Sequence, residues 1–388
     1  MGLFEKIFKY RKDLAGAGTV FKTVNGYTPV FTSWNGKIYE SLLVRAAIHT
    51  RATHISKLRI VFHGTAKPKL QRRLTQRPNE WQTWGQFLYR LSTILDVHNT
   101  AFIVPVLDEF GETVGIFPVL PNRCELREYG GTVYLRYAFA SGQYAAVEFH
   151  RCGLMTKFQY MDDFFGENNE ALRPTMELVN IQNQGISEAI RSSATFRFMA
   201  RMTNFSDPKD LAEERKRFTR NNLEASSGGL LLFPNTYDNI QPIKASPYVV
   251  DAGQMAAIEK NVNNYYGVNE DILQNKAYGD GWNAFYEGVP EWFGIQFADV
   301  LRDMLFSSRE QVAGAGVTAS ANRLQYMSNK DKMLATQTFA DRGLAMRDEI
   351  REIWNLPPLP DGKGQTIPMR GEYYNLGEKR KEPKHGTE

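Results

Sequence analysis

Residues 174–202 have the sequence PTMELVNIQNQGISEAIRSSATFRFMARM. Pro174 suits the first turn of a helix, and no further proline follows before Met202. A helix of this length spans about 40 Å at 1.5 Å per residue. Its surface is mostly glutamine, asparagine and serine with few aliphatic residues, so it does not suit the core of a small globular domain. The stretch therefore predicts a helix that packs against copies of itself or lines water.

On the N-terminal side of this helix, the sequence predicts helices and a β-meander that close a first domain near residue 160. Apolar spacing predicts a helix over 38–57 and a strand over 58–62, whereas 66–76 is polar and loop-like. Asn79 is typical of an N-cap, and an apolar stripe follows from Trp81. β-rich runs separated by turns then predict strands at 101–107, 113–120, 124–127, 133–139 and 145–149. The first forty residues, rich in glycine and threonine, predict an arm.

The C-terminal side alternates helices with polar breaks. A second helix is predicted over 253–266, and a polar, glycine-containing tract over 274–281 is expected to be flexible. Gly288 and Pro290 predict a kink ahead of an apolar helix. The remaining predictions are a charged helix at 210–221, a strand at 230–233, a polar turn at 234–239, a loop at 314–321, a last helix at 331–354 and a disordered tail.

Length and composition limit the class of protein. The chain has 388 residues, enough for two or three domains, with 42% hydrophobic and 23% charged residues. That is too apolar for a disordered chain, and the sequence has no long uncharged apolar run that would span a membrane. The first ten residues make a poor signal peptide. Two cysteines, Cys124 and Cys152, predict reduced thiols rather than a disulfide framework.

Positive charge is concentrated in one stretch, although the net charge is only +4. Residues 41–79 contain no carboxylate. One interpretation is a surface that faces phosphates. The alternative, which we favour because aromatic residues do not alternate with the charges, is a basic outer face or one that meets an acidic neighbouring subunit. The cations are Arg45, Arg51, Lys57, Arg59, Lys67, Lys69, Arg72, Arg73 and Arg77.

No motif for catalysis emerges. The six histidines lack partners at metal-ligand spacing, and residues 362–366 only partly match a phosphate-binding loop. Asp162 and Asp163 could act as a carboxylate pair, but beside Phe164 and Phe165 they are more typical of a loop. We therefore predict no catalytic residue, metal site or cofactor, while an active site assembled from distant positions stays open.

Four stretches, in order, resemble the portal proteins of long-tailed bacteriophages over about residues 40–365. They are Arg77-Pro78-Asn79 with its helix up to Asn99-Thr100-Ala101-Phe102; Val119 to Arg123 after a β-hairpin; Tyr266 to Leu273; and Gly343 to Arg351 with Asn355-Leu356-Pro357-Pro358. The chain departs from the family pattern at His98, Asn269 and Asp348, and 169–172 replaces the usual segment before the long helix.

The resemblance implies an α+β, portal-type fold that forms a ring, usually of twelve copies. Its parts would be an α/β wing, a two-helix stem, a small α/β clip inserted between the stem helices, and a helical C-terminal crown. We assign an arm to 1–40, the wing to 41–173, stem helices to 174–202 and 253–273, and the clip to 203–252. The tunnel-loop region is 274–289, the wing-packing helix and return are 290–327, the crown is 328–365 and the flexible tail is 366–388.

The same resemblance implies the function and its candidate residues. The ring would be the channel for double-stranded DNA during packaging and ejection, at one vertex of a virion made in the host cytoplasm. The partners would be further copies of the chain, terminase large subunit, a head–tail adaptor, and major capsid or scaffolding protein, with no membrane. The candidates are Lys276, Tyr278, Gly279, Asp280 and Gly281 for the tunnel loop; Gln184, Ser187, Glu188, Arg191, Lys260 and Asn264 for the channel lining; and Glu214, Arg217, Arg220, Asn235 and Tyr237 for clip docking.

Two other functions remain as alternatives. Another head–tail structural protein is one, although such adaptors are typically much shorter than this chain. The other is a nucleic-acid-processing enzyme that uses the basic stretch 41–79, with Asp162 and Asp163 as metal-binding carboxylates.

Overall fold

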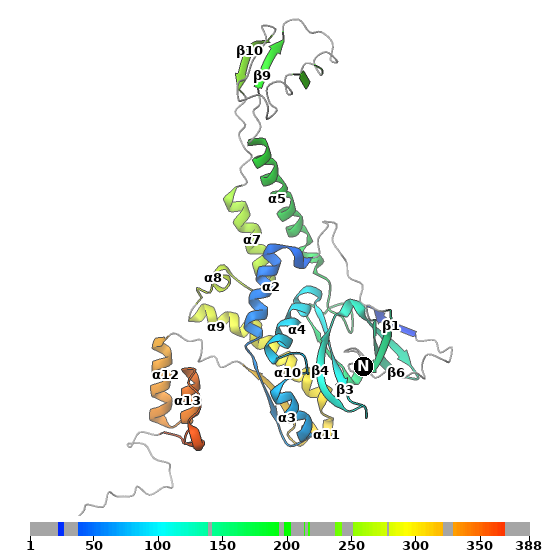
Figure 1. The fold of residues 1–388 in the computed structure, drawn as a ribbon, viewed down its shortest axis with the longest axis vertical. Coiled ribbons are helices and arrows are strands. Elements are labelled where there is room, and N and C mark those ends of the chain that lie inside the picture. Colours follow the sequence, from blue (N-terminus) through cyan, green and yellow to red (C-terminus); the bar gives the residue numbers. More distant parts are fainter. Residues whose placement is uncertain are drawn as a thin grey trace, which may run out of the picture. The chain divides into compact units, whose positions relative to one another are not determined.

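The computed structural model describes residues 22–26, 38–138, 142–193, 198–202, 213, 216–217, 237–242, 251–277, 279–320 and 329–368. The chain divides into two compact units, one formed by Met1–Ala171 with Val262–Glu388 and the other by Leu172–Asn261. Figure 1 labels the elements of each. None of the described helices has the length and apolar character needed to cross a membrane.

Three helices build the helical core of the first unit: α2 (Leu42–Ile55), α4 (Trp84–His98) and α10 (Trp292–Leu305). The apolar stripe of α4 is buried as predicted, and its ring of Phe87 lies against Phe297 of α10 with centroids 6.1 Å apart. The predicted start at Asn79 is wrong, because Thr83 is the N-cap and forms a capping box with Gln86.

Asn79 has a different task. Its side-chain oxygen accepts hydrogen bonds from the backbone N–H of Trp81 and Gln82, at 3.0 and 2.9 Å, and its amide donates to the Ile116 carbonyl at 2.9 Å. The residue thus closes a turn ahead of the helix and fastens it to a strand.

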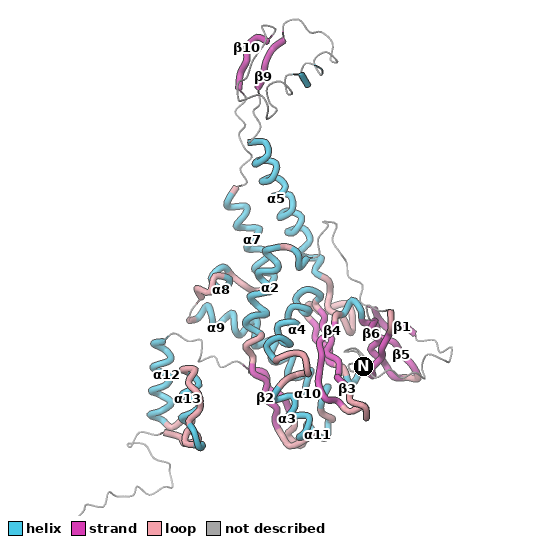
Figure 2. Tube along the Cα trace, viewed as in Figure 1, coloured by secondary structure: helices cyan, strands magenta, loops and turns pink. Residues whose placement is uncertain are grey.

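Two antiparallel sheets form the predicted β-meander (Figure 2). One has the order β4-β3-β8, with β3 (Thr100–Leu107) between β4 (Thr113–Val119) and β8 (Gly153–Thr156). The other has the order β1-β5-β6-β7. Its strands are Lys22–Gly26, Cys124–Tyr129, Thr132–Ala138 and Tyr144–Glu148. The predicted arm therefore contributes an edge strand, β1, to the meander.

One apolar core joins the two sheets. Phe102, Leu126 and Leu135 are fully buried in it, and Cys124 and Cys152 belong to the same cluster. Both cysteines are free thiols, as predicted, and burial raises the pKa of each. A thiol that resists ionisation is a poor nucleophile, so both act as small apolar core residues.

A two-stranded antiparallel ladder, β2 (Arg59–His63) with β11 (Gly316–Ser320), lies beside α10. The predicted loop at 314–321 is therefore wrong over the strand. Gly294 of α10 permits the close approach, because an added Cβ would lie 2.9 Å from the Ala319 carbonyl oxygen. The predicted loop at 66–76 is also wrong, since α3 (Pro68–Gln76) begins with proline in its first turn.

The kink predicted at Gly288 and Pro290 falls on an irregular turn within a continuous helical segment. Helix α9 (Asp280–Tyr286) continues through a π-helical turn, Glu287–Glu291, into α10. Pro290 lies inside this turn, where its missing N–H removes one hydrogen-bond donor from the helix ladder.

The last predicted helix, 331–354, is in fact two. Helix α12 (Asn329–Arg342) ends where Gly343 adopts a φ of 66°, and the Leu344 N–H then bonds the Phe339 carbonyl at 3.1 Å. This is the glycine-terminated helix end of the Schellman type. Helix α13 (Arg347–Ile353) returns beside α12, and the Trp354 Nε1–H donates to Thr336 Oγ1 at 2.8 Å.

In the second unit, α5 (Arg173–Ser193) is shorter than the helix predicted over 174–202. Phe198–Met202 is instead a strand, β9, that pairs antiparallel with β10 (Tyr237–Pro242). The predicted turn at 234–239 is thus wrong from Tyr237 onward. Within the predicted helix 210–221, residues 213, 216 and 217 are helical and the rest lie outside the described residues, as does the predicted strand 230–233.

Helix α7 (Ala252–Tyr266) matches the second predicted helix and runs from the second unit into the first. Two short helices, α8 (Glu270–Leu273) and α11 (Ser308–Val312), follow along the chain. Five 3-10 turns complete the described elements: Ile38–Glu40, Pro121–Arg123, Phe149–Arg151, Asn169–Leu172 and Pro360–Gly362.

Candidate functional site

The predicted tunnel loop is a short turn between two helices. Asn269 caps α8 by accepting a hydrogen bond from the Ile272 N–H at 2.9 Å, and the Lys276 N–H donates to the Asp271 carbonyl at 2.7 Å. Gly279 then reverses the chain with a φ of 58° ahead of α9. Lys276, Gly279, Asp280 and Gly281 are all exposed, whereas Tyr278 lies outside the described residues. Helix α9 shows that 274–289 is not one continuous loop.

Aromatic packing holds the helix that follows this turn. The His54 ring of α2 lies 4.8 Å from the Trp282 ring and 5.5 Å from the Phe285 ring, both in edge-on geometry. Burial, with a contribution from neighbouring Lys57, lowers the pKa of His54 to about 4. The imidazole is therefore neutral at pH 7, which suits a ring packed between aromatic side chains.

The end of α7 is held by a buried ion triad, formed by Arg51, Asp96 and Lys157. Arg51 Nε donates to Asp96 Oδ2 at 2.8 Å and Lys157 Nζ lies 3.1 Å from Asp96 Oδ1, while Arg51 Nη1 donates to the Tyr266 carbonyl. The Asp96 side chain is only 1% exposed. Burial lowers the pKa of Lys157, and the Asp96 carboxylate opposes that change. The Asp96 carboxylate thus joins α4 to α2 and to the bend after β8, and Arg51 extends the link to the end of α7.

A cluster of amides extends this polar core. Asn99 Nδ2 donates to Asn169 Oδ1 at 2.7 Å, and the Tyr265 hydroxyl donates to the same oxygen at 2.6 Å. Asn169 in turn donates to the Val97 carbonyl at 2.8 Å. The last turn of α7 is consequently fixed by specific hydrogen bonds and not only by apolar packing.

Our prediction from the sequence did not include this polar core. One signal was available, because Asp96 is a lone carboxylate near the end of the otherwise apolar stripe of α4. A buried charge of that kind needs a partner, and Arg51 is at an equally apolar position of α2.

The structure describes the side chains of some of the candidate channel-lining residues but not of others. Gln184 and Ser187 are exposed on α5, and Lys260 and Asn264 are exposed four residues apart on α7. Glu188 and Arg191 lie within α5, but their side chains are outside the described part. The exposed polar residues agree with a helix surface that faces water.

The candidate clip residues are described only in part. Tyr237 begins β10 and pairs with Met202 of β9. Arg217 is helical and exposed. Glu214, Arg220 and Asn235 lie outside the described residues.

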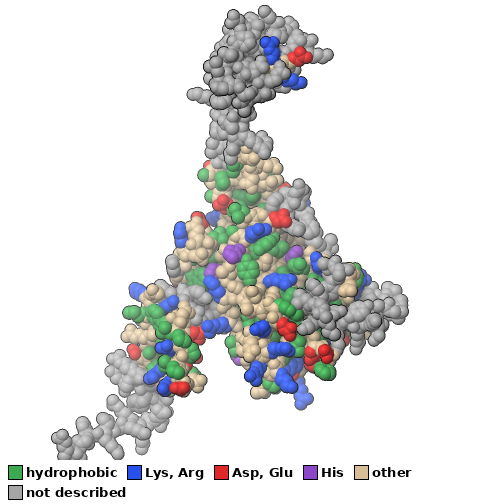
Figure 3. Space-filling model, in the orientation of Figure 1, with side chains coloured by type: hydrophobic (Ala, Val, Ile, Leu, Met, Phe, Trp, Pro, Cys, Tyr) green, Lys and Arg blue, Asp and Glu red, His purple; other side chains and the backbone are tan. Residues whose placement is uncertain are grey.

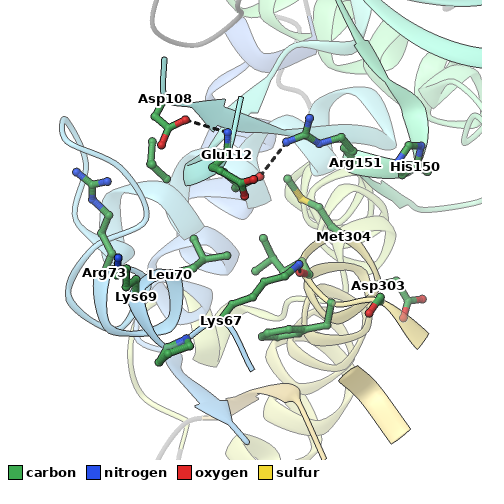
Figure 4. A pocket seen from close by; sticks show the side chains of 16 residues that line it. Lys67, Lys69, Leu70, Arg73, Asp108, Glu112, His150, Arg151, Asp303 and Met304 are labelled. Atoms are coloured by element: carbon green, nitrogen blue, oxygen red, sulfur yellow. Dashed lines mark hydrogen bonds between the residues drawn. The ribbon is translucent and has the colours of Figure 1, made fainter. Parts of the chain in front are cut away.

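An open groove of about 860 Å³ lies between α3, the β3–β4 hairpin and the end of α10 (Figure 4). Its floor is apolar, with Leu70 and Met304 among the lining residues, and its rim carries Lys69 and Arg73 beside Asp108. Asp108 accepts hydrogen bonds from the N–H groups of its own turn, at Phe110 and Glu112. An apolar floor with a rim of both charges is typical of a protein contact surface and not of a phosphate site.

Some cations of the basic stretch 41–79 form ion pairs, and others are exposed. Arg51 is buried in the ion triad, Arg59 pairs with Glu352, and Lys67 lies 3.5 Å from Glu310. Lys69, Arg72 and Arg73 of α3 are exposed, and among the described residues no ion pair engages them. The stretch is therefore not one continuous phosphate-binding face.

The carboxylate pair proposed for an enzyme belongs to a turn. Asp162 Oδ1 accepts hydrogen bonds from the N–H groups of Phe164 and Phe165 at 2.8 and 2.9 Å. Over the described ranges, histidine, cysteine and carboxylate side chains form no cluster of three that could hold a metal ion.

Structural comparison finds the same fold in particles of gene transfer agents. The neck of a native particle, computed with C12 symmetry, matches with a TM-score of 0.56 and 15% identity over 89% of this chain and 98% of that chain. The neck of an empty particle, computed with C6 symmetry, gives 0.55 and 14% over 86% and 97%. The virion of a native particle gives 0.54 and 16% over 86% and 97%. No curated protein matches the chain in sequence.

A family model described as phage portal protein matches residues 43–355, which is most of the chain. The match includes every strand of the two sheets of the meander except β1, helices α5 and α7, and the α9–α10 segment. The chain therefore belongs to the phage portal protein family, whose members are structural proteins that form the portal of a capsid.

Proposed function

We propose that this chain assembles into a twelve-membered ring whose central channel carries double-stranded DNA into and out of a capsid. The observation that supports this most strongly is the similarity in fold to the C12 neck, which extends over 98% of that chain. The ring stands at one vertex of the virion, and the chain is made in the cytoplasm of the host.

Each region of the chain has a part in this assembly. The two sheets with α2, α4 and α10 form the wing, and α5 with α7 forms the stem. The clip lies between the stem helices and contains the β9–β10 ladder, and α12 with α13 forms the crown. The exposed polar residues of α5 and α7 support the assignment to the stem, because a channel that binds DNA too tightly would prevent its passage.

The turn at Lys276 and Gly279 is the tunnel loop. This assignment is supported by an exposed turn that lies next to firmly packed helices. The turn itself is exposed, whereas α9, which follows it, is fixed by aromatic packing on His54, and the end of α7, which precedes α8, is fixed by the ion triad. A loop that contacts moving DNA needs such a fixed base.

The partners follow from the assembly. The clip binds the terminase large subunit during packaging and a head–tail adaptor afterwards, and the wing meets major capsid or scaffolding protein. The protein needs no cofactor for this role and is not an enzyme.

Electron microscopy of the purified chain, with its mass in solution from light scattering, tests the proposal. We expect rings with a central hole and a mass of about twelve subunits. A uniform monomer at high protein concentration would contradict the channel.

A further inference from the structure

The groove between α3, the β3–β4 hairpin and the end of α10 combines an apolar floor with a charged rim (Figure 4). All three elements contribute to the floor, where Leu70, Val114 and Met304 are half-buried. Most of the charged side chains on the rim already have partners within the chain. Those that have none determine the charge of a molecule that the groove can bind.

The carboxylates of the rim are accompanied by donors or cations of this chain. Asp108 accepts hydrogen bonds from two N–H groups of its own turn, and Asp303 accepts one from Arg302 at 3.2 Å. Glu112 is exposed on the hairpin, where Arg151 donates hydrogen bonds to the residues on both sides of it, at 2.9 and 3.4 Å. The hairpin and α10 therefore offer little uncompensated negative charge.

The cations of α3 differ from these carboxylates. Lys67, just before the helix, donates to the Leu305 carbonyl at 2.6 Å and lies 3.5 Å from Glu310. Lys69 and Arg73, by contrast, are exposed on the rim, and within the described ranges no ion pair engages either of them. Figure 3 shows lysine and arginine side chains gathered where α3 lies. The α3 wall thus presents two positive charges that need a counter-charge from outside.

The spacing of these two cations fits a helical partner. Lys69 and Arg73 are four residues apart, so they share one face of α3 and are separated by about 6 Å along its axis. Leu70 is about 100° around the helix from Lys69, on the side of the floor. A second helix laid along the groove repeats its side chains at the same interval. Its glutamates can therefore reach both cations while its apolar face covers the floor.

We propose that this groove binds an acidic amphipathic helix of another protein, with carboxylates against Lys69 and Arg73 and apolar side chains against Leu70 and Met304. The inference goes beyond the proposed ring and does not depend on it, because all the lining residues belong to the first unit. The apolar floor favours such a helix over a nucleic-acid duplex, whose outer surface is a phosphate backbone and buries no apolar area.

Fluorescence anisotropy with the full chain tests this proposal. The probe is a labelled peptide with leucine at positions i, i+3, i+4 and i+7 and glutamate elsewhere. We expect the unmodified chain to bind it, and added salt to weaken the binding. Lys69→Glu combined with Arg73→Glu should raise the Kd at least about tenfold, and Leu70→Ser about fivefold. The control Arg72→Glu is exposed on the same helix but does not line the groove, so the Kd should change less than about twofold.

Two comparison probes, a glutamate peptide without leucine and a DNA duplex, decide between occupants. Equal binding of the leucine-free peptide would overturn the proposal, because charge alone would explain it. A duplex that displaces the peptide and binds more tightly would assign α3 to phosphates instead. Rings that bind no peptide would overturn the groove and leave the portal function standing. Loss of rings in the Lys69→Glu, Arg73→Glu variant would show that a neighbouring copy occupies the groove, and not another protein.

Discussion

At the scale of single residues, the ion triad of Arg51, Asp96 and Lys157 places more buried charge together than a solvated pair of side chains would, because the Asp96 side chain is only 1% exposed. Two cations share this one carboxylate. The side chains of Arg51 and Lys157 are themselves only 6% and 11% exposed, so water cannot easily take the place of the carboxylate. We expect Asp96→Asn to lower the free energy of unfolding by about 3–5 kcal/mol, because both cations would be left buried without a counter-charge. Chemical denaturation followed by circular dichroism measures this.

A matched control for that prediction is Asp361→Asn. The Asp361 side chain is 79% exposed and lies 3.8 Å from Lys363, so the charge pair is well solvated. The unfolding free energy should change by less than about 0.5 kcal/mol. Equal losses in the two variants would show that the triad is not the cause.

His54 makes the stability depend on pH. Its pKa is lowered from 6.5 to about 4 in the folded chain, so the folded state disfavours the proton that the unfolded state binds. The stabilisation is fully present above pH 6.5 and is lost as the pH falls toward 4. At pH 5 the loss has an upper limit of about 2 kcal/mol, and we expect about 1 kcal/mol because the ring keeps some contact with water.

The variant His54→Phe separates this contribution from that of His98, whose pKa burial also lowers to about 4. Phenylalanine keeps an aromatic ring beside Trp282 and Phe285 but binds no proton. Urea denaturation at pH 7 and pH 5 should show a smaller loss for His54→Phe than for the unmodified chain. An identical pH dependence in the two would rule out His54 as the source.

At the scale of elements, the sequence was sufficient to predict a helix or strand wherever its apolar residues follow one clear periodicity. The stripe of α4, the strands β3 to β7 and helix α7 were predicted and are present, whereas β1 and β8 of the two sheets were not predicted. Helix α3 was missed because its residues are nearly all polar, and only Leu74 is buried. Strand β11 was missed because its small residues have little preference for a strand. It forms a strand because it pairs with β2. Arg51 of the ion triad also bonds the Tyr266 carbonyl, 215 positions away in the chain, and no local pattern encodes that proximity.

Gly343 decides that residues 329–353 form two helices and not one. Its φ of 66° is in the left-handed region, where an added Cβ costs about 1–2 kcal/mol. We expect Gly343→Ala to weaken the end of α12 by about that amount, with faster hydrogen exchange at the Leu344 and Ile350 amides. The control Gly288→Ala lies in a helical turn with open space around it and should not destabilise. Unchanged exchange in Gly343→Ala would show that the glycine is not required.

At the scale of the whole molecule, the basic side chains and the neutral polar side chains lie on different elements. The first unit neutralises part of its basic stretch, at Arg51, Arg59 and Lys67, whereas Lys69, Arg72 and Arg73 of α3 are exposed and form no ion pair with other described residues. The exposed channel-lining candidates on α5 and α7 are mainly neutral amides and hydroxyls. An assembly that must let DNA slide through it benefits from this separation, because each phosphate contact in the channel adds affinity that opposes movement.

The turn proposed as the tunnel loop gives the sharpest test of this separation. Deleting residues 275–279 removes the exposed turn but leaves α8 and α9, which begins at Asp280, and leaves the His54 packing and the ion triad untouched. Rings should therefore still assemble, whereas the amount of DNA protected from nuclease in a packaging reaction should fall severalfold. A deletion of Glu109–Gly111 at the exposed β3–β4 turn is the control and should package normally. If the 275–279 deletion also packages and retains DNA normally, the turn does not contact DNA, and the loop must be sought elsewhere in the channel.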